Sequence, residues 1–316
     1  MTIKNRSRIC LIISAVIILV ALGLHLAGQG INLGIDFAGG LSMQYDMKTA
    51  VTASDVNTVL ENMGVTSSTV TVQGRDNNEV NIRIKDISKD DIQKVQADFE
   101  AGIKETYPEA VSIGDVNYVG PVAGATLVRN AIISVLLAAG LMLIYIAIRF
   151  DLNSGIAAVF GLLHDVLIML SFMVIFRSVI QMNSSFIAAA LTIVGYSINN
   201  TIVIFDRIRE NAKKMPTAPR EEITNISIRE SLGRTICTTV TTLITIVALC
   251  ILGVASIREF ALPIIVGILS GVYSANMING YVWAFLEEKR RSRKAKACLL
   301  KQRGTAVTQS LSVFSS

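Results

Sequence analysis

The chain has 316 residues, of which 52% are hydrophobic and only 17% are charged, and its mean hydropathy is +0.54. These values lie far outside the range of soluble globular domains and nearly exclude a soluble enzyme. The net charge of +5 could indicate a nucleic-acid partner, but the basic residues flank apolar runs and the one large polar region is acidic, so no nucleic-acid role is expected.

Six apolar runs of about 18 residues or more predict a polytopic α-helical membrane protein with six transmembrane helices. Only the third run contains an acidic residue, Asp165. The first run is too long for the apolar part of a cleaved signal sequence, and no small-residue cleavage site follows it, so we expect it to be retained as an anchor. The predicted spans are Ile9–Ala27, Ala131–Ile148, Ser154–Phe176, Ser184–Phe205, Thr235–Ile257 and Phe260–Leu286.

Charge asymmetry predicts the orientation. Residues 28–128 hold 14 acidic and 7 basic residues, a net charge of −7, so the rest of the chain carries +12. The basic excess lies in residues 1–8, in the connection 206–234 and in the tail 287–316. By the positive-inside rule, both termini and that connection are expected to be cytoplasmic, and residues 28–129 extracytoplasmic. Within the connection, Arg220–Ser231 is predicted to be a helix on the membrane surface.

Residues 28–129 are numerous enough to bury a core of their own. Their pattern predicts the order βαββαβ, which packs most simply as a four-stranded antiparallel sheet with both helices on one face, an α+β ferredoxin-like domain. This segment lacks His and Cys, so a binding surface is expected rather than an active site. The predicted elements are Leu41–Met47, Thr52–Met63, Thr69–Gln73, Glu79–Ile84, Lys89–Tyr107 and Val111–Val119.

Glycine-rich pieces border this domain on both sides, at Gly34–Gly40 and Gly120–Gly124. They are either hinges between the domain and the membrane helices or ordinary turns. The four cysteines have no CxxC spacing and none lies in the outer domain, so we expect no disulfide framework, metal site or cofactor.

Ionisable residues in the spans are few, and such residues usually mark an ion or substrate path. His164 and Asp165 in the third span are the clearest candidates, although they could also serve only to pack helices. Asn199 and Asn200 in the fourth span are polar and uncharged, and the same two interpretations apply to them. Asp206, at the end of the fourth span, is expected to join a salt-bridge cluster with neighbouring arginines.

Arg234 opens the fifth span, and Thr238, Thr241 or Thr242, and Thr245 follow it on one helical face. This face either lines a wet seam, or Arg234 extends to the headgroups while the threonines bond their own backbone. In the sixth span, Gly267 with Gly271 and Ser270 with Ser274 predict a small-residue face for close helix packing.

These motifs resemble the SecD/SecF family of protein-export membrane proteins, on its SecF side, over roughly residues 9–290. The residues that carry the resemblance are Gly34-Ile-Asp-Phe-Ala-Gly-Gly40, Val119-Gly-Pro-Val122, Leu163-His-Asp-Val-Leu167, Val194-Gly-Tyr-Ser-Ile-Asn199, Phe205-Asp-Arg-Ile-Arg-Glu-Asn211 and Gly271-Val-Tyr-Ser274.

The resemblance implies a subunit that assists export of unfolded preproteins across the bacterial plasma membrane, driven by the proton-motive force. It implies SecD as the partner that supplies the second half of a transporter-like pair, SecYEG as the translocon, lipid around the helices, and no chemistry on the substrate. The family usually has an aspartate, taken as the proton carrier, at the position of Asn200, with an arginine partner that matches Arg234.

Asparagine cannot carry a proton near neutral pH, so the relay does not transfer directly to this chain. Either SecD holds the working carboxylate, which is the account we favour from the sequence, or Asp165 replaces it, or the coupling ion is Na⁺, which an Asn carbonyl oxygen can bind. Three other functions are less well supported: a structural scaffold of the translocon, a solute exporter of the same superfamily, and an intramembrane aspartyl protease that would use Asp165 and Asp206.

Overall fold

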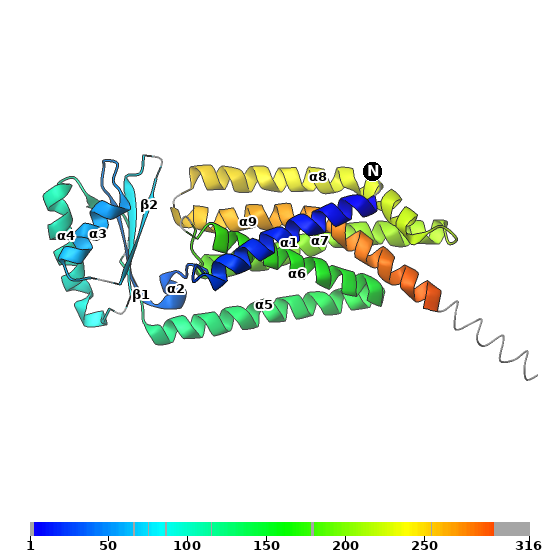
Figure 1. The fold of residues 1–316 in the computed structure, drawn as a ribbon, viewed down its shortest axis with the longest axis horizontal. Helices are drawn as coiled ribbons and strands as arrows, with labels where there is room; N and C mark the ends of the chain where they lie inside the picture. Colours follow the sequence, from blue (N-terminus) through cyan, green and yellow to red (C-terminus); the bar gives the residue numbers. More distant parts are fainter. Residues whose placement is uncertain are drawn as a thin grey trace, which may run out of the picture.

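The six apolar runs fold into six long helices that form a bundle, and a β-sheet domain stands at one end of it (Figure 1). The computed structural model describes residues 3–293 except 66, 75, 86, 115, 178, 179 and 254. We call the end of the bundle nearer the sheet the domain end and the opposite end the distal end. The long helices are α1 (Ile3–Leu26), α5 (Pro121–Arg149), α6 (Leu152–Ile175), α7 (Ser184–Lys214), α8 (Arg220–Leu252) and α9 (Ala255–Ser274).

Each of these helices contains a stretch that is long and apolar enough to cross a membrane, which confirms the six predicted spans. Helix α9 continues through a π-helical turn, η2 (Ala275–Asn279), into a further helical stretch that reaches residue 293. Half or more of the residues in the apolar windows of α6, α7 and α9 are buried, against 11% or less in α1, α5 and α8. Helices α6, α7 and α9 therefore form the centre of the bundle, and α1, α5 and α8 present apolar side chains outward.

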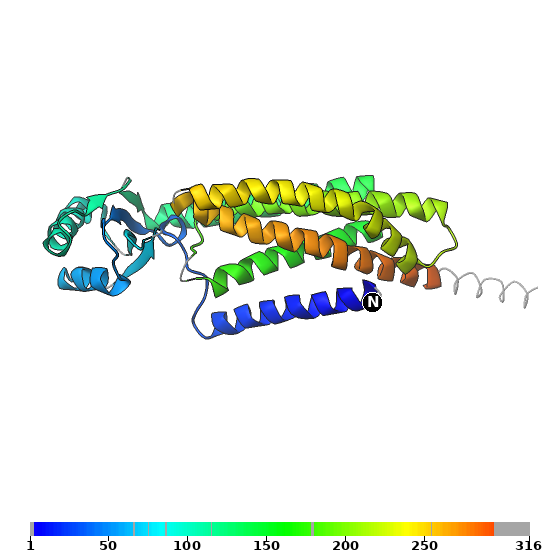
Figure 2. The same ribbon diagram turned by 90° about the horizontal axis from the view of Figure 1, so that it is seen from above.

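Helix α1 contacts the bundle through one stripe of small residues. Of its described side chains, only Ser7, Ser14 and Ala21 are buried, and these are spaced seven residues apart. A spacing of seven returns to nearly the same face of a helix every two turns. Small residues on that face let α1 approach α6 closely, as is common between membrane helices, and Figure 2 shows α1 running beside α6 at the edge of the bundle.

The connection between the fourth and fifth spans differs from the prediction. Helix α7 runs on to Lys214 and α8 already begins at Arg220, so only residues 215–219 separate them. The helix predicted over Arg220–Ser231 is therefore the first part of α8. It is held there because Ile223 and Ile228 are buried in the same apolar core as α7 residues.

The β-sheet domain follows the predicted order of elements, with one correction. The strands are β1 (Gly40–Asp46), β2 (Ser68–Gln73), β3 (Glu79–Ile84), β4 (Val111–Ser112) and β5 (Asn117–Val119). They are antiparallel in the order β2-β3-β1-β4, and β5 also pairs with β1. The single strand predicted over Val111–Val119 is wrong, because Gly114, at φ +103°, interrupts it, so the sheet has five strands and not four.

Helices α3 (Ala53–Asn62) and α4 (Ile92–Thr106) cover one face of the sheet, and a 3₁₀ turn, η1 (Lys89–Asp91), precedes α4. Alternation along β1 sends Leu41, Met43 and Tyr45 into the core. The core that they share with both helices also contains Val56, Leu60, Ile82, Phe99 and Ile103. The opposite, more polar face of the sheet is left to face the bundle (Figure 1).

The first glycine-rich piece is folded rather than extended. It contains a short helix, α2 (Ile35–Ala38), which packs against the start of α5. The Gly34 N–H donates to the Met182 carbonyl over 2.8 Å, and the Asp36 carboxylate accepts the Ser184 N–H over 2.7 Å. At Gly40, φ is +120° and a Cβ atom would lie 2.4 Å from the Ile84 carbonyl oxygen, so this position requires glycine.

Candidate functional site

The most polar point in the centre of the bundle is the carboxylate of Asp165 on α6, whose exposed fraction is 0%. Three serine hydroxyls donate to it. Ser197 of α7 and Ser274 of α9 bind Oδ2 over 2.5 and 2.8 Å, and Ser270 of α9 binds Oδ1 over 2.7 Å. Buried carboxylates are costly unless donors replace the lost water, and here the two central helices α7 and α9 supply those donors to α6.

His164 connects this carboxylate to α1. Its Nδ1 lies 3.0 Å from Asp165 Oδ1, and its Nε2 lies 2.7 Å from the Ser14 hydroxyl. The neutral ring can donate from Nδ1 to the carboxylate while Nε2 accepts the Ser14 proton. The Tyr273 hydroxyl lies 3.1 Å from Ser14 Oγ and also donates to the Cys10 carbonyl. A continuous hydrogen-bonded chain therefore runs from Asp165 to α1.

A second polar layer lies one helical turn nearer the distal end. Asn279 donates from Nδ2 to the Thr201 hydroxyl over 2.8 Å, and Thr201 lies four residues after Ser197. The Asn279 amide packs directly on Gly161, four residues before Asp165, where a Cβ atom would lie 2.0 Å from Asn279 Oδ1. Both Asn279 and its buried neighbour Asn276 belong to the π-helical turn, a feature frequent at functional sites.

The structure separates the two asparagines of the fourth span. Asn199 is exposed on the outside of the bundle, whereas Asn200 is 2% exposed. The Asn200 Nδ2 atom has no acceptor among the described residues. No hydrogen bond or ion pair in the described part of the chain joins either asparagine to Arg234 or Asp165.

The fifth-span face is exposed, and its hydroxyl groups are already satisfied. Thr238 donates to the Arg234 carbonyl, Thr241 to the Cys237 carbonyl, and Thr245 to the Thr241 carbonyl, all within α8. The interpretation in which the threonines bond their own backbone therefore describes this chain. The Arg234 side chain lies on the outer surface, with no ion pair among the residues that the structure describes.

Asp206 lies at the distal end of α7 and pairs with Arg149 of α5 over 3.2 Å. The two side chains are 47% and 46% exposed, and an ion pair of that kind contributes roughly 0–1 kcal/mol to stability. Its partner is not one of the neighbouring arginines, since Arg207 pairs with Glu210 and Glu230 instead. Asp206 lies nine residues after Ser197, the α7 residue that binds Asp165, and so more than two helical turns away, and the structure does not bring together the two carboxylates that a protease would need.

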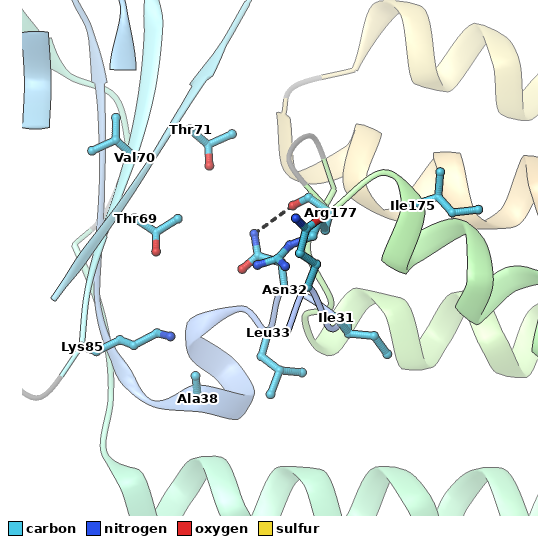
Figure 3. Close-up of a pocket in the computed structure, with 11 residues that line it drawn as sticks. Ile31, Asn32, Leu33, Ala38, Thr69, Val70, Thr71, Lys85, Ile175 and Arg177 are labelled. Atoms are coloured by element: carbon cyan, nitrogen blue, oxygen red, sulfur yellow. Dashed lines mark hydrogen bonds between the residues drawn. The ribbon is translucent and has the colours of Figure 1, made fainter. Parts of the chain in front are cut away.

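A cleft of about 840 Å³ separates the polar face of the sheet from the domain end of the bundle (Figure 3). Thr69, Thr71 and Lys85 line its sheet side, and Asn32 and Arg177 line its bundle side. Figure 3 shows Asn32 held beside Arg177, to whose carbonyl its Nδ2 donates over 3.1 Å.

A second, adjoining cleft of about 410 Å³ contains Arg83 and Glu259 among its lining residues. Burial lowers the pKa of Arg83 to about 10, and the nearby Glu259 carboxylate opposes that change. Asn183 donates to Glu259 over 2.6 Å, so charged and amide groups from both sides line the junction between domain and bundle.

Sequence reasoning identified His164 and Asp165 but missed the groups that surround them. The sequence pattern assigns Ser270 and Ser274 to packing, includes Ser197 and Tyr273 only as members of family motifs without a role, and gives no indication of Ser14. The signal was available in part, because Ser270 and Ser274 are spaced four apart and so share a helical face. Only the packing of α6 against α7 and α9 shows that this face meets Asp165. No group of three or more His, Cys, Asp or Glu side chains that could hold a metal lies among the described residues.

Residues 98–289 match the family described as protein export membrane protein SecD/SecF, C-terminal. Residues 26–51 match the family described as the SecD/SecF GG motif. The second match contains α2 and the glycines around it, and the first contains all of the helices that surround Asp165 except α1.

Several curated proteins are similar over most of this chain. Protein translocase subunit SecF of Rickettsia bellii is 34% identical over 259 residues, covering 82% of this chain and 84% of that protein. SecF of Thermodesulfovibrio yellowstonii is 41% identical over 248 residues, covering 77% of this chain and 80% of that protein. Protein translocase subunit SecDF of Bacillus subtilis is 37% identical over 257 residues, but the chain spans only 34% of its length.

Solved structures agree with these matches. The crystal structure of SecDF from Thermus thermophilus, a translocon-associated membrane protein, superimposes with a TM-score of 0.80 at 32% identity, covering 91% of this chain and 39% of that one. The crystal structure of SecDF in a super-membrane-facing form gives a TM-score of 0.65 at 30% identity, covering 94% of this chain and 40% of that one.

Proposed function

The chain belongs to the SecD/SecF family of protein-export membrane proteins, and from that premise we propose that it is the SecF-type subunit that uses an ion gradient to assist preprotein export. It works with a SecD-type partner beside the SecYEG translocon and performs no chemistry on the preprotein. The observation that carries this proposal is the fully buried Asp165 carboxylate on α6, which three hydroxyl donors from α7 and α9 surround.

A SecD-type partner is supported by the length comparison and by the surface of the bundle. This chain matches 34% of the length of the Bacillus subtilis SecDF and 39% of the SecDF in the crystal structure. More than half of each SecDF therefore lies outside the match. Helices α1, α5 and α8 leave most of their residues exposed, and the Arg234 side chain lies on that outer surface. A charged side chain on a membrane helix usually faces protein or water, so a partner over α8 would give Arg234 a polar neighbour.

The proposed location is the bacterial plasma membrane, with both termini in the cytoplasm and the β-sheet domain outside. The distal end carries the basic excess of the chain, which the positive-inside rule assigns to the cytoplasmic side. We also propose that the outer domain is ferredoxin-like. Its support is the antiparallel order β2-β3-β1-β4, with α3 and α4 sharing one core on one face.

For ion coupling, we propose that Asp165 is the working carboxylate of this chain, because Asn200 occupies the position where the family usually has an aspartate. Protonating Asp165 would remove the charge that the three serine hydroxyls and His164 bind, and would therefore alter the contacts between α6, α7 and α9. Such a change could reach the outer domain, since α7 and α9 begin beside the cleft at the domain end. The names of the relatives do not favour a solute exporter or a passive scaffold.

The test is preprotein translocation into inverted vesicles that contain the complex with its SecD-type partner, with proton and Na⁺ gradients imposed separately. Asp165→Asn should abolish the stimulation by the coupling gradient, and Asp165→Glu should retain part of it. The matched control is Asp206→Asn, which removes a carboxylate at the surface and should leave stimulation intact. If Asp165→Asn folds, binds its partner and still responds fully to both gradients, the coupling role of Asp165 is excluded.

A further inference from the structure

The distal end of the bundle contains a cleft of about 260 Å³ that the proposed function does not use. It lies where α6 begins, α7 ends and α8 begins, beside the continuation of α9. Trp283 forms part of its wall, and Phe150 and Ile208 provide apolar surface beside it. The cleft is therefore partly apolar. It lies where the apolar runs 131–148 and 184–205 end, which is the level expected for lipid headgroups.

Two residues that line this cleft contain three buried donor atoms with no acceptor among the described residues. The indole Nε1 of Trp283, a residue that is 6% exposed, has no acceptor in the described part of the chain. The same is true of Nε and Nη1 of Arg220. All three atoms can only donate hydrogen bonds, and buried donors normally have partners. A ligand that satisfied them would have to present several acceptor oxygens.

The charges in the cleft favour an anion. Its lining includes four basic side chains and two carboxylates, a formal excess of two positive charges. The carboxylates already have partners: Asp151 accepts the Ser154 hydroxyl over 2.6 Å, and Glu287 accepts Asn153 Nδ2 over 2.6 Å and pairs with Arg290 over 3.6 Å. Residues 1–2 and 294–316 contain no Asp or Glu. The basic side chains are Arg209, Lys213, Arg220 and Arg290.

We propose that this cleft binds a phosphate group, supplied by the headgroup of an anionic phospholipid in the adjacent leaflet. A phosphate group offers acceptor oxygens to Arg220 and Trp283, and guanidinium groups bind phosphate with good geometry. Basic pockets between membrane helices commonly hold anionic headgroups. Because the cleft is shared by α6, α7, α8 and the end of α9, a bound headgroup would fasten these four helices together at the distal end. The inference does not depend on Asp165.

Trp283 is the single tryptophan of the chain, so its fluorescence reports on this cleft. The complex with its SecD-type partner is reconstituted into phosphatidylcholine vesicles that contain increasing fractions of brominated phosphatidylglycerol, whose bromine quenches indole emission. A parallel series uses brominated phosphatidylcholine. Trp283→Phe supplies the background from the partner. We expect the anionic lipid to quench Trp283 at a clearly lower mole fraction than the neutral one.

Lys213→Gln is the test variant and Lys289→Gln the matched control, because Lys289 carries the same charge near the same surface but does not line the cleft. Lys213→Gln should weaken the preference for the anionic lipid about fivefold, because Lys213 lines the cleft and would lie beside the bound headgroup. Lys289→Gln should weaken it less. Arg220→Gln, which removes two of the unpaired donors, should weaken it further.

Two results would overturn the proposal: equal quenching by the two brominated lipids, or equal losses in Lys213→Gln and Lys289→Gln. Inorganic phosphate is added separately to vesicles of phosphatidylcholine alone. No response of Trp283 is expected there. A response that Arg220→Gln abolishes would assign the cleft to soluble phosphate and exclude the lipid as its source.

Discussion

The Ser270 hydroxyl donates to Oδ1 of Asp165 over 2.7 Å, although the two residues are 105 positions apart in the chain. Ser274, one helical turn later, binds the other carboxylate oxygen. The sixth span therefore contributes two donors to one ion, and a shift of α9 along its axis would exchange or remove both. This arrangement makes the contact between α6 and α9 depend on the charge of Asp165.

The first prediction concerns the strength of this contact. Ser274→Ala should destabilise the protein by about 1.5–3 kcal/mol, the usual worth of a hydrogen bond to a charged group. Thermal unfolding in mild detergent measures the change. The matched control is Thr245→Ala, because Thr245 is exposed on α8 and bonds only its own backbone. Equal unfolding temperatures for the two variants would show that Ser274 does not support the carboxylate.

The second prediction concerns the layer beside it. In Gly161→Ala the new methyl group would overlap the Asn279 amide, so α6 and the π-helical turn must separate. Overpacking of this kind typically costs about 1–3 kcal/mol. Gly140→Ala is the control, because nothing lies within 4 Å of its Cβ position and alanine favours a helix. We expect Gly161→Ala to unfold at a lower temperature and Gly140→Ala to match or exceed the wild type.

The sequence predicted the six apolar helices well because each is a long apolar run with at most one acidic residue, and membrane spans require little else. It predicted the core of the outer domain for a related reason: alternation along β1 and β3 directly reports which face is buried. The ends of elements were less predictable. Helix α8 extends past its apolar run because its first turns pack on α7, and such tertiary contacts leave no periodic signal of their own.

The candidate site was predictable only as isolated residues. Asp165 is conspicuous because it is the single carboxylate inside an apolar run, but its donors come from helices that lie about 30 to 110 positions away in sequence. A serine in a membrane helix is compatible with packing, with back-bonding and with ion binding. Which role each serine has depends on how α7 and α9 are rotated about their axes, because the rotation determines which side chains face Asp165. That rotation results from the packing of the whole bundle.

The third prediction concerns the entry to the outer domain. Gly40→Ala should disrupt the start of β1, because its φ of +120° is strained for alanine and the methyl group would meet the Ile84 carbonyl. Gly64 also has a positive φ, but it has open space around its Cβ position. Gly64→Ala should therefore lower the stability of the domain only by the backbone strain, about 1–2 kcal/mol. The two variants are compared by measuring how well the outer domain resists protease digestion in the whole protein. Equal resistance of the two variants would contradict the proposed close approach of β1 and β3.

The fourth prediction is a pH dependence at the start of α3. The side chain and backbone N–H of Thr52 both donate to Asp55 and lower the pKa of that carboxyl group below its ordinary value. A lowered pKa in the folded state stabilises the fold above the ordinary carboxyl pKa, and this stabilisation is lost as the pH falls through the folded value. Protection of α3 amides from hydrogen exchange should therefore decrease between about pH 5 and about pH 3.

Thr52→Ala removes the side-chain donor, so α3 in that variant should be less protected at neutral pH and should lose less protection on acidification. Thr49→Ala is the control, because Thr49 is exposed just before α3 and bonds only the Met47 carbonyl. An acid response of Thr52→Ala as large as that of the wild type would mean that other carboxylates determine it.

The last prediction concerns Arg234, which faces outward at the start of the fifth span. If a carboxylate of the SecD-type partner meets this guanidinium group, Arg234→Ala removes a charge-assisted contact worth about 1.5–3 kcal/mol and should lower gradient-driven export about tenfold or more. Arg229→Ala is the matched control, because Arg229 is also exposed on α8 but lies more than one turn nearer the distal end. Export into inverted vesicles under a proton gradient measures both variants, and recovery of the partner with each variant shows that the complex is intact. Full activity of Arg234→Ala would mean that this side chain only extends along α8 to the headgroups, and that the partner does not use the fifth-span face.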